Sequence, residues 1–534
     1  MAFGKWQVND SSRFKIMIYK GHIIWVDDEV HHLKPHIMFL ESKGYKVSSV
    51  TNGIDADVLN RKNRYDLVLL DQNMPGLDGI ETLKKIKSHR ESMPVVMITK
   101  SEDEWLMDEA ISQQIHQFLI KPVSPNQVYI TCKQILEKNR IIEDKTSADY
   151  LKDFQEINQN IDFISSPDDW WSLYLRLVKW QIKFEEHADL SLQNILTDQM
   201  KTCNQRFNKY IEDNYEYLIK DETQSLFSPS VFEKHAKPIL EKKNKVCIII
   251  IDCMRCDQFL SIYSHLESLF SMDISYHLSL LPSATPYSRN AIFSGLFPDE
   301  LIKRYPKQRD SFLNSSQGLN KYENELLIDQ LSRLKMEDKK VHYHKIWALE
   351  EGKRFSKKIN NFLDKDVLAL VVNFVDMLAH DSSKLEVLKE IIPDELGYRH
   401  TVKSWVKNSW FNDVLKQLSE SDFEVIITSD HGSVKVNREV MVSADKDASS
   451  GVRYKYGRNL NTRNKNVIKI DEPHKYRLPA FGPQFNYLIA KNDSYFLYPN
   501  DAHKYKNKLL DSFQHGGVSM EEMLVPVIKM KGVK

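Results

Sequence analysis

The C-terminal half of the chain contains aspartates and histidines whose spacing suits a metal site. Three apolar runs, "KVCIIIID", "VLALVVNFVD" and "FEVIITSD", end in Asp252, Asp376 and Asp430. His380 follows Asp376 by four residues, so one helical turn would place both side chains on the same side. His431 directly follows Asp430. Mixed aspartate and histidine ligands suit Zn²⁺ or Mn²⁺ better than Mg²⁺, so the pattern predicts metal-assisted chemistry.

Two further residues extend this candidate site. Thr285 has a proline close on either side in "LLPSATPYSRNAIFSG", and a rigid turn there would hold its hydroxyl as a nucleophile that a metal or a base activates. His515 precedes a Gly-Gly pair in "QHGGVSMEEMLVPV". Any one of these residues alone is more often structural, because an aspartate after a strand commonly caps the next helix. Three such aspartates with three nearby histidines favour a metal site.

A second constellation lies near the N-terminus. Its members end or follow apolar runs and are Asp27, Asp28, Asp71, Thr99 and Lys121. Converging carboxylates repel one another unless a cation binds between them, and hard oxygen ligands suit Mg²⁺. A carboxylate beside Mg²⁺ can accept a phosphoryl group, with Thr99 and Lys121 placed to hold its oxygens.

Alternating strands and helices must position both constellations, which predicts a multidomain α/β fold. Residues 17–140 contain five apolar runs separated by amphipathic stretches, typical of a doubly wound (βα)5 sheet with its site beyond the carboxyl ends of the strands. Residues 141–235 lack strand patterns. Residues 236–534 again indicate α/β structure, with strands apolar along their length, as in sheets covered on both faces. Residues 1–16 are a predicted disordered lead-in.

The middle segment predicts a small helical bundle that links the two α/β domains. Its apolar stripe recurs at helical spacing and consists of Trp171, Tyr174, Leu175, Val178 and Ile182. The tryptophans could instead form a ligand site, but aromatic residues at this spacing more often face a core. We expect the bundle to transmit a signal from the first domain to the last.

A C-x-x-C pair, Cys253 and Cys256, directly follows Asp252. It would suit a redox dithiol or half of a zinc site, but a zinc site needs two more ligands and the chain has no second C-x-x-C. We expect both cysteines to pack in the turn and the first helical turn after the strand.

A basic segment with interleaved aromatic residues, "RYKYGRNLNTRNKNVIKI", begins at Arg453. Arg453, Lys455 and Arg458 could hold phosphates while Tyr454 and Tyr456 stack on bases. The alternative is a solvated surface loop, which is the more common role of such a segment.

The composition argues against several classes of protein. The 534 residues carry no formal net charge and are 42% hydrophobic, which is ordinary for a globular chain and argues against a protein that coats nucleic acid or an anionic membrane. No aliphatic run approaches the ~18–20 residues of a membrane helix, so we expect no membrane insertion. The N-terminus lacks a signal-peptide pattern, and five cysteines, an odd and sparse set, predict a reducing, cytoplasmic location.

The N-terminal constellation resembles that of response-regulator receiver domains. The resemblance also covers "DQNMPGLDG", which begins at Asp71, and Phe118 at the position of the family's switch aromatic. It implies that a sensor histidine kinase phosphorylates Asp71 and that Asp27 and Asp28 hold Mg²⁺. The backbone carbonyl of Asn73 would be a further ligand. Receivers of this kind often form homodimers when phosphorylated.

The C-terminal constellation resembles the alkaline phosphatase superfamily and, in "HGGVSMEEMLVP" and "TSDHG", its PglZ family. The resemblance implies two Zn²⁺ ions. The ligands of one would be Asp252, Thr285, Asp430 and His431, and those of the other Asp376, His380 and His515.

The same resemblance implies a reaction. Thr285 would attack phosphorus and form a phosphothreonine that water hydrolyses. Alkaline phosphatases proper have serine at this position and phosphodiesterase branches commonly have threonine, which favours diester substrates. Asn290 or Arg289 would contact the phosphoryl oxygens.

The order of the three parts resembles PorX-type response regulators, which act with type IX protein secretion. It implies a phosphorylation-controlled, zinc-dependent phosphodiesterase or phosphatase that acts on linear or cyclic oligonucleotides. The alternative is a phosphorylation-controlled binding module for secretion or transcription partners, with a catalytically minor PglZ-like domain. A DNA-binding regulator is a third option, for which the chain lacks a helix-turn-helix signal.

Overall fold

The computed structural model describes most of the chain. The described residues are 19–100, 104–186, 190–221, 226–313, 320–382, 385–443, 449, 451–499 and 502–533. The predicted lead-in of residues 1–16 lies outside the described residues. The chain divides into two compact units, Met1–Leu151 and Lys152–Lys534, and each is described by itself.

The N-terminal unit contains a five-stranded parallel sheet in the order β2-β1-β3-β4-β5. The strands are β1 (His22–Val26), β2 (Lys46–Val50), β3 (Leu67–Asp71), β4 (Val95–Thr99) and β5 (Gln117–Ile120). The helices are η1 (Val30–Leu33), α1 (Lys34–Ser42), α2 (Gly53–Lys62), α3 (Gly79–His89), α4 (Glu104–Ser112) and α5 (Pro125–Leu136). This confirms the predicted doubly wound fold.

Alternation along the strands explains why helices cover both faces of this sheet. In β1, Ile24 and Val26 belong to one buried cluster, while Ile23 and Trp25 belong to the cluster on the opposite face. Successive strand side chains point to opposite faces, so an uninterrupted apolar strand needs apolar cover on both sides.

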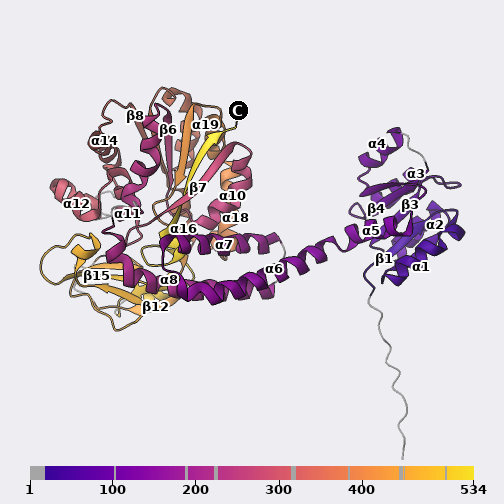
Figure 1. Cartoon of the computed structure of the whole chain (residues 1–534), viewed down its shortest axis with the longest axis horizontal. Helices are drawn as coiled ribbons and strands as arrows, with labels where there is room; N and C mark the ends of the chain where they lie inside the picture. The colour runs from indigo at the N-terminus through magenta and orange to yellow at the C-terminus, as the bar shows by residue number, and fades with distance from the viewer. Residues whose placement is uncertain are drawn as a thin grey trace, which may run out of the picture. The chain divides into compact units, whose positions relative to one another are not determined.

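The predicted helical bundle consists of three helices that belong largely to the C-terminal unit. They are α6 (Lys138–Asn160), α7 (Pro167–Glu186) and α8 (Leu190–Leu218), with the short η2 (Ile161–Phe163) between α6 and α7. Trp171, Tyr174 and Val178 of the predicted stripe are buried. Trp171 stacks on Tyr276 of β7, with ring centroids 5.0 Å apart. The stripe therefore packs on the sheet of the C-terminal unit as well as within the helices. In that unit α7 and α8 run side by side (Figure 1).

The C-terminal unit is built on a six-stranded mixed sheet in the order β7-β18-β10-β6-β9-β8. Its strands are β6 (Lys245–Ile251), β7 (Phe270–Leu278), β8 (Val341–Ile346), β9 (Val367–Val372), β10 (Phe423–Thr428) and β18 (Leu524–Gly532). The four strands β10, β6, β9 and β8 are parallel, and β18 runs antiparallel to both β10 and β7.

Helices cover both faces of the C-terminal sheet (Figure 1). One face packs against α10 (Cys256–Glu267), α18 (Glu395–Asn408) and α19 (Trp410–Ser419), and the other against α11 (Thr285–Ser294) and α14 (Glu323–Arg333). The side chains of β6 alternate between these two apolar clusters, since Ile249 and Ile251 join the first and Ile248 and Ile250 the second. The apolar run beginning at Lys245 is therefore a central strand, as predicted.

The remaining helices and strands of this unit border the sheet. The helices are η3 (Ser228–Ser230), η4 (Phe232–Ala236), α9 (Lys237–Glu241), α12 (Pro298–Arg304), η5 (Pro306–Gln308), α13 (Arg309–Leu313), α15 (Leu349–Lys358), η7 (Ile359–Phe362), α16 (Phe374–Ser382), α17 (Glu386–Ile391), η8 (Pro473–Tyr476), α20 (Ala502–Leu509) and α21 (Met520–Met523). The strands are β11 (Val434–Lys435), β12 (Arg438–Met441), β13 (Tyr454–Arg458), β14 (Val467–Ile470), β15 (Phe485–Ala490), β16 (Ser494–Leu497) and β17 (Phe513–Gln514).

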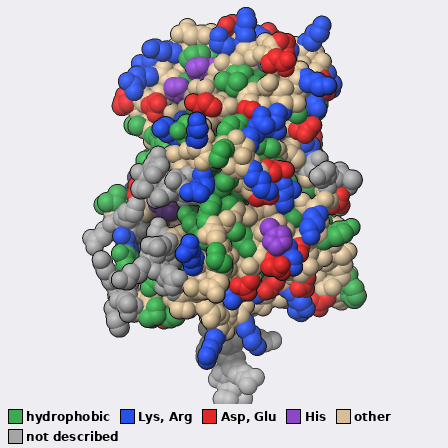
Figure 2. All heavy atoms as spheres, turned by 90° about the vertical axis from the view of Figure 1, so that its left-hand side faces the viewer, with side chains coloured by type: hydrophobic (Ala, Val, Ile, Leu, Met, Phe, Trp, Pro, Cys, Tyr) green, Lys and Arg blue, Asp and Glu red, His purple; other side chains and the backbone are tan. Residues whose placement is uncertain are grey.

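The surface fits the balanced composition. Acidic and basic side chains are interspersed over the face of the molecule seen in Figure 2. Across the part of the chain that is described, we find no helix with both the length and the apolar character that a bilayer crossing requires.

Candidate metal centres and active site

The N-terminal candidate site lies at the carboxyl ends of β1 and β3. Ligand atoms of Asp27, Asp28 and Asp71 all lie within 4.8 Å of one another. Lys121 Nζ contacts Asp27 Oδ2 at 2.8 Å and Asp71 Oδ1 at 3.0 Å. Burial raises the pKa of the Asp71 carboxyl, and the Lys121 ammonium opposes that rise. Three carboxylates with one ammonium leave the site net acidic, which suits a divalent cation.

The other residues predicted for this site lie on neighbouring elements. Thr99 is the last residue of β4 and is buried, whereas Asn73 lies in the loop after β3 and is exposed. Phe118 is in β5 and packs, partly buried, against the core cluster that contains Ile24. The roles predicted for these three residues stay predictions.

The first C-terminal cluster consists of Asp252, Asp430 and His431, all buried, with ligand atoms within 4.8 Å of one another. Asp252 directly follows β6, and Asp430 and His431 lie just beyond β10, the adjacent parallel strand. Gly432 lets this loop pass close to the backbone of Glu521, because a Cβ at this position would lie 2.0 Å from the carbonyl oxygen of Glu521.

The sequence suggested an isolated turn around Thr285. In the structure Thr285 is instead the first residue of α11. Its Oγ1 lies 3.0 Å from His431 Nε2 and 3.4 Å from Asp252 Oδ1. Pro286 has no N–H and the Tyr287 and Ser288 N–H groups donate to the Ala284 carbonyl, so the N-terminus of α11 would favour an anion through the positive end of its helix dipole. The hydroxyl thus lies between the carboxylate cluster and a position suited to a phosphoryl group.

The second C-terminal cluster consists of Asp376, His380 and His515. Asp376 lies in the first turn of α16, since β9 ends at Val372, so the prediction that Asp376 ends the strand is wrong. The helix places His380 one turn later, with Nε2 3.4 Å from Asp376 Oδ1. His515 Nε2 lies 3.7 Å from the same oxygen and 3.3 Å from His380 Nε2.

The donor atoms of both clusters fit metal ions. Asp430 Oδ2 is buried and accepts no hydrogen bond from the described residues, an arrangement that costs free energy unless a cation binds there. Burial, followed by the nearby Asp252 carboxylate, raises the pKa of Asp430 to about 6. Burial and the neighbouring His431 and His380 hold the pKa of His515 well below its usual range, so its ring keeps a lone pair for a metal.

Arg289 lies at the edge of the first cluster. Its Nη1 donates to Asp252 Oδ2 at 2.5 Å and lies 3.8 Å from Asp430 Oδ2. Its Nε donates to Glu323 Oε1 at 2.7 Å. The guanidinium is buried and committed to these carboxylates, so it positions Asp252, and the predicted contact of Arg289 with phosphoryl oxygens disagrees with the structure.

Sequence reasoning missed three residues that support this cluster. Asn373 Nδ2 donates to Asp252 Oδ2 at 2.9 Å, Glu323 anchors Arg289, and Lys345 Nζ lies 3.5 Å from Glu323 Oε2. Asn373 interrupts the apolar run "VLALVVNF", which was a usable signal. Glu323 and Lys345 carry no such signal, because only the packing of α14 and β8 brings them to the site.

The C-x-x-C pair is structural. Cys253 lies in the turn after β6 and Cys256 is the first residue of α10; both are buried and neither forms a disulfide. Burial raises the pKa of each thiol well above its usual range. Since the thiolate is the reactive and metal-binding form, neither cysteine is suited to redox chemistry or metal binding.

Three further predicted substrate contacts disagree with the structure. Arg453 is buried, and its Nε and Nη2 donate to the Glu522 carboxylate at 2.8 Å each. Lys455 is buried with Nζ 4.4 Å above the Tyr498 ring. Asn290 is buried and donates to the carbonyl of Pro286. A buried side chain that is committed to such partners cannot reach a substrate.

Strand alternation explains the error in the basic segment. β13 turns Lys455 into the interior and leaves Tyr454 and Tyr456 partly exposed on the other face, and Arg453, directly before the strand, is buried as well. A Cβ added at Gly516 would lie 2.4 Å from the Tyr454 ring, and one at Gly517 would lie 2.3 Å from Arg453 Nη2. The Gly-Gly pair after His515 therefore lets the loop pass close to β13, and Arg453 supports that loop.

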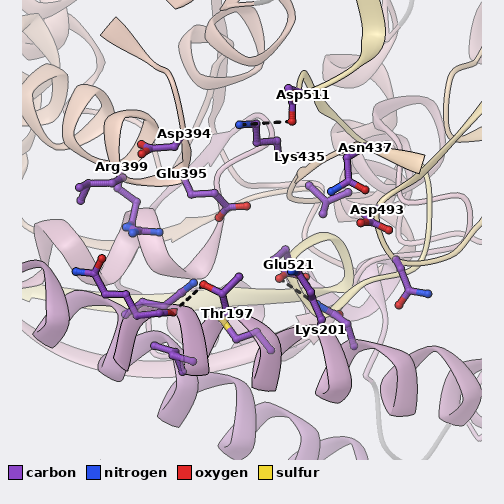
Figure 3. A pocket seen from close by; sticks show the side chains of 18 of the residues that line it. Thr197, Lys201, Asp394, Glu395, Arg399, Lys435, Asn437, Asp493, Asp511 and Glu521 are labelled. Atoms are coloured by element: carbon purple, nitrogen blue, oxygen red, sulfur yellow. Dashed lines mark hydrogen bonds and ion pairs between the residues drawn. The ribbon is translucent and has the colours of Figure 1, made fainter. Parts of the chain in front are cut away.

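A cavity of about 490 Å³ lies within the C-terminal unit, between α8 and the N-terminus of α18, and the predicted metal ligands do not line it (Figure 3). Charged residues of both signs line the cavity, with Glu395 and Arg399 on one side and Lys201 on the other. At its edge, Asn204 Nδ2 of α8 donates to both oxygens of Glu521 at 2.9 and 3.1 Å. The helices of the predicted linker thus contact the segment that supports Gly432.

Comparison with protein families assigns each part of the chain. The model of the BREX system PglZ alkaline phosphatase-like domain matches residues 231–530. The response regulator receiver domain matches residues 23–133, and the PorX response regulator linker domain matches residues 140–219.

Individual relatives resemble the N-terminal part. The transcriptional regulatory protein SrrA of Staphylococcus aureus is 28% identical over 136 residues, which span 26% of this chain and 56% of SrrA. The chemotaxis protein CheY4 of Vibrio cholerae is 25% identical, with a TM-score of 0.21, over 22% of this chain and 98% of CheY4. A two-component response regulator of Clostridium difficile is 26% identical, with a TM-score of 0.21, over 22% and 96% of the two chains.

The three family matches follow one another along the chain, and the largest covers more than half of it. A receiver domain precedes a PorX linker domain and an alkaline phosphatase-like domain. The chain therefore belongs to the PglZ family and, by this order of domains, to the PorX-type response regulators.

Proposed function

We propose that the chain is a two-component response regulator whose C-terminal unit is a zinc-dependent phosphodiesterase acting on nucleotide diesters. The observation that most directly supports this proposal is the position of Thr285 Oγ1 at the N-terminus of α11. This oxygen lies 3.0 Å from His431 Nε2 and 3.4 Å from Asp252 Oδ1. Asp252, Asp430 and His431 would hold one zinc ion together with Thr285, and Asp376, His380 and His515 would hold the other. When bound, the two ions would favour the deprotonated hydroxyl and neutralise the phosphoryl oxygens.

In this proposal different residues of the chain have different roles in the reaction. The Thr285 oxygen forms a bond to phosphorus as the bond to the leaving alcohol breaks, and the alcohol leaves with a proton taken from water. Water then hydrolyses the phosphothreonine and restores the hydroxyl. The N-terminus of α11 would lie beside the phosphoryl oxygens, and Arg289 would hold the Asp252 carboxylate in place.

The receiver would control this activity. Asp27, Asp28, Asp71 and the carbonyl of Asn73 would hold Mg²⁺, and a sensor histidine kinase would supply the phosphoryl group to Asp71. Lys121, which already contacts Asp71, would pair with the phosphoryl oxygens. The resemblance to PorX-type regulators supports a cytoplasmic protein that dimerises on phosphorylation and acts in type IX secretion.

Hydrolysis of bis(4-nitrophenyl) phosphate by the zinc-loaded chain tests the enzymatic proposal. We expect turnover that a chelator abolishes and that added zinc restores. Thr285→Ala should retain both metal ions and lose turnover by about 10³-fold or more, because the nucleophile is gone. Turnover that neither the chelator nor Thr285→Ala changes would contradict the proposal. Inertness of the zinc-loaded chain toward mono- and diesters would favour a binding module.

A further inference from the structure

Trp347 lies at the same edge of the catalytic sheet as the metal ligand candidate Asp252. In the parallel register Ile346 pairs with Val372, and Val372 pairs with Ile251. Trp347 and Asp252 are the next residues along their strands, two strand spacings apart, so their backbones are separated by roughly 10 Å. This distance is comparable with the extent of one nucleotide.

A series of charged side chains connects the Trp347 ring to the candidate active site around Asp252. Lys345 Nζ lies 4.8 Å from the ring centroid and 3.5 Å from Glu323 Oε2. Glu323 in turn binds Arg289, whose Nη1 contacts Asp252. The ring therefore lies on the side of the sheet edge where Arg289 reaches the candidate active site, with the Lys345 ammonium beside it.

The ring remains accessible although it is held in place. Trp347 is 52% exposed, and its backbone N–H donates to Glu351 Oε2 at 3.0 Å, which fixes the start of α15. Tyr454 and Tyr456 are less suitable, because they are only partly exposed and their rings pack on Tyr287 and Tyr487. An aromatic face that is positioned but open to solvent is the kind of surface on which nucleobases stack.

We propose that Trp347 is the platform for a nucleobase whose phosphate lies at the metal centre, with Lys345 beside that phosphate or its neighbour. This inference rests on the proposed function, and it adds the residue through which the base of the nucleotide substrate would be recognised.

Calorimetric titration of the zinc-loaded full-length chain with AMP and with ribose 5-phosphate tests the platform. The two compounds share the sugar and the phosphate and differ in the base. We expect AMP to bind at least tenfold more tightly, the order of magnitude that base stacking contributes. Trp347→Ala should remove most of that preference without changing ribose 5-phosphate binding, and Trp347→Phe should keep much of it.

Controls separate the two proposals. Phe163→Ala removes another exposed aromatic side chain from the same unit and should leave the AMP preference intact. Equal binding of both compounds by the unmodified chain, or a preference that survives Trp347→Ala and disappears in Tyr456→Ala, would overturn the platform while leaving the metal centre in place. Binding of neither compound would contradict the phosphate site and the platform together.

Discussion

His431 and His515 stack with their ring centroids 4.2 Å apart and their planes inclined by 21°. The two rings serve different clusters, because His431 Nε2 faces Thr285 while His515 Nε2 faces Asp376 and His380. The stack joins the two candidate metal sites into one centre. A substitution of either histidine should therefore change the geometry of both clusters.

His515→Ala tests this joint centre. We expect the zinc content, measured by plasma mass spectrometry, to fall from about two ions per chain to one or fewer, and diester hydrolysis to fall at least ~100-fold. His474→Ala, at an exposed histidine of the same unit, is the control and should keep both ions. Two ions retained in His515→Ala would contradict the proposed ligand set.

The receiver site predicts a change of mass on activation. Asp71 lies 3.0 Å from Lys121 and within 4.8 Å of two further carboxylates, so beryllofluoride with Mg²⁺ should bind there as a phosphoryl mimic. We expect light scattering to show a shift from monomer to dimer with the mimic. Asp71→Asn should stay monomeric under the same conditions. An unchanged mass for the unmodified chain would count against phosphorylation-dependent dimerisation.

The contact of Asn204 in α8 with Glu521 predicts that the linker helices stabilise the rest of the C-terminal unit. Its side chain donates to Glu521 and accepts from the Met520 N–H, and burial raises the pKa of the Glu521 carboxyl. Asn204→Ala should lower the free energy of unfolding by about 1–3 kcal/mol, because buried polar groups lose their partner. The midpoint of thermal unfolding measures this loss.

Lys201→Ala is the matched control for that experiment. Lys201 lies on the same helix and pairs with the exposed Asp198, so its removal should change stability by less than about 0.5 kcal/mol. An Asn204→Ala midpoint equal to that of Lys201→Ala would show that the contact with Glu521 does not stabilise the unit.

Lys455 predicts a pH dependence of stability. Burial lowers the pKa of its ammonium to about 8. The folded state therefore releases this proton more readily than the unfolded state, and the free energy of unfolding should fall by about 2–3 kcal/mol between pH 10 and pH 7 as the buried amine becomes charged. Lys455→Met removes this penalty, so its stability relative to the unmodified chain should be higher at pH 7 than at pH 10. The same difference at both pH values would show that Lys455 is not the cause.

The N-terminal unit could be predicted almost completely because its signals are local. All of its strands except β2 are short apolar runs, and the predicted site residues other than Phe118, which lies within β5, are at a strand end or in the loop that follows it. In a parallel sheet the carboxyl ends of strands meet at one edge, so the convergence of Asp27, Asp71 and Lys121 follows from the order of the elements.

The C-terminal unit was less predictable where element boundaries mattered. "VLALVVNFVD" looks apolar to its end, but the strand stops at Val372 and Asp376 belongs to α16. The basic segment looked like a phosphate-binding surface, but a strand sends alternate side chains to opposite faces, and Lys455 faces inward while Arg458 is exposed. A composition pattern cannot reveal which face a strand buries, because the neighbouring elements decide it.

The sequence by itself determined the types of the candidate ligands, the candidate nucleophile and the order of the three domains, because aspartates after apolar runs, H-G-G and D-H-G are local patterns. Only the tertiary structure decided that His431 and His515 stack, that Glu323 and Lys345 connect Arg289 to Trp347, and that Arg453 supports a loop. These contacts join residues far apart in the chain. They form because packing of the sheet and its helices brings those residues together, which no local pattern encodes.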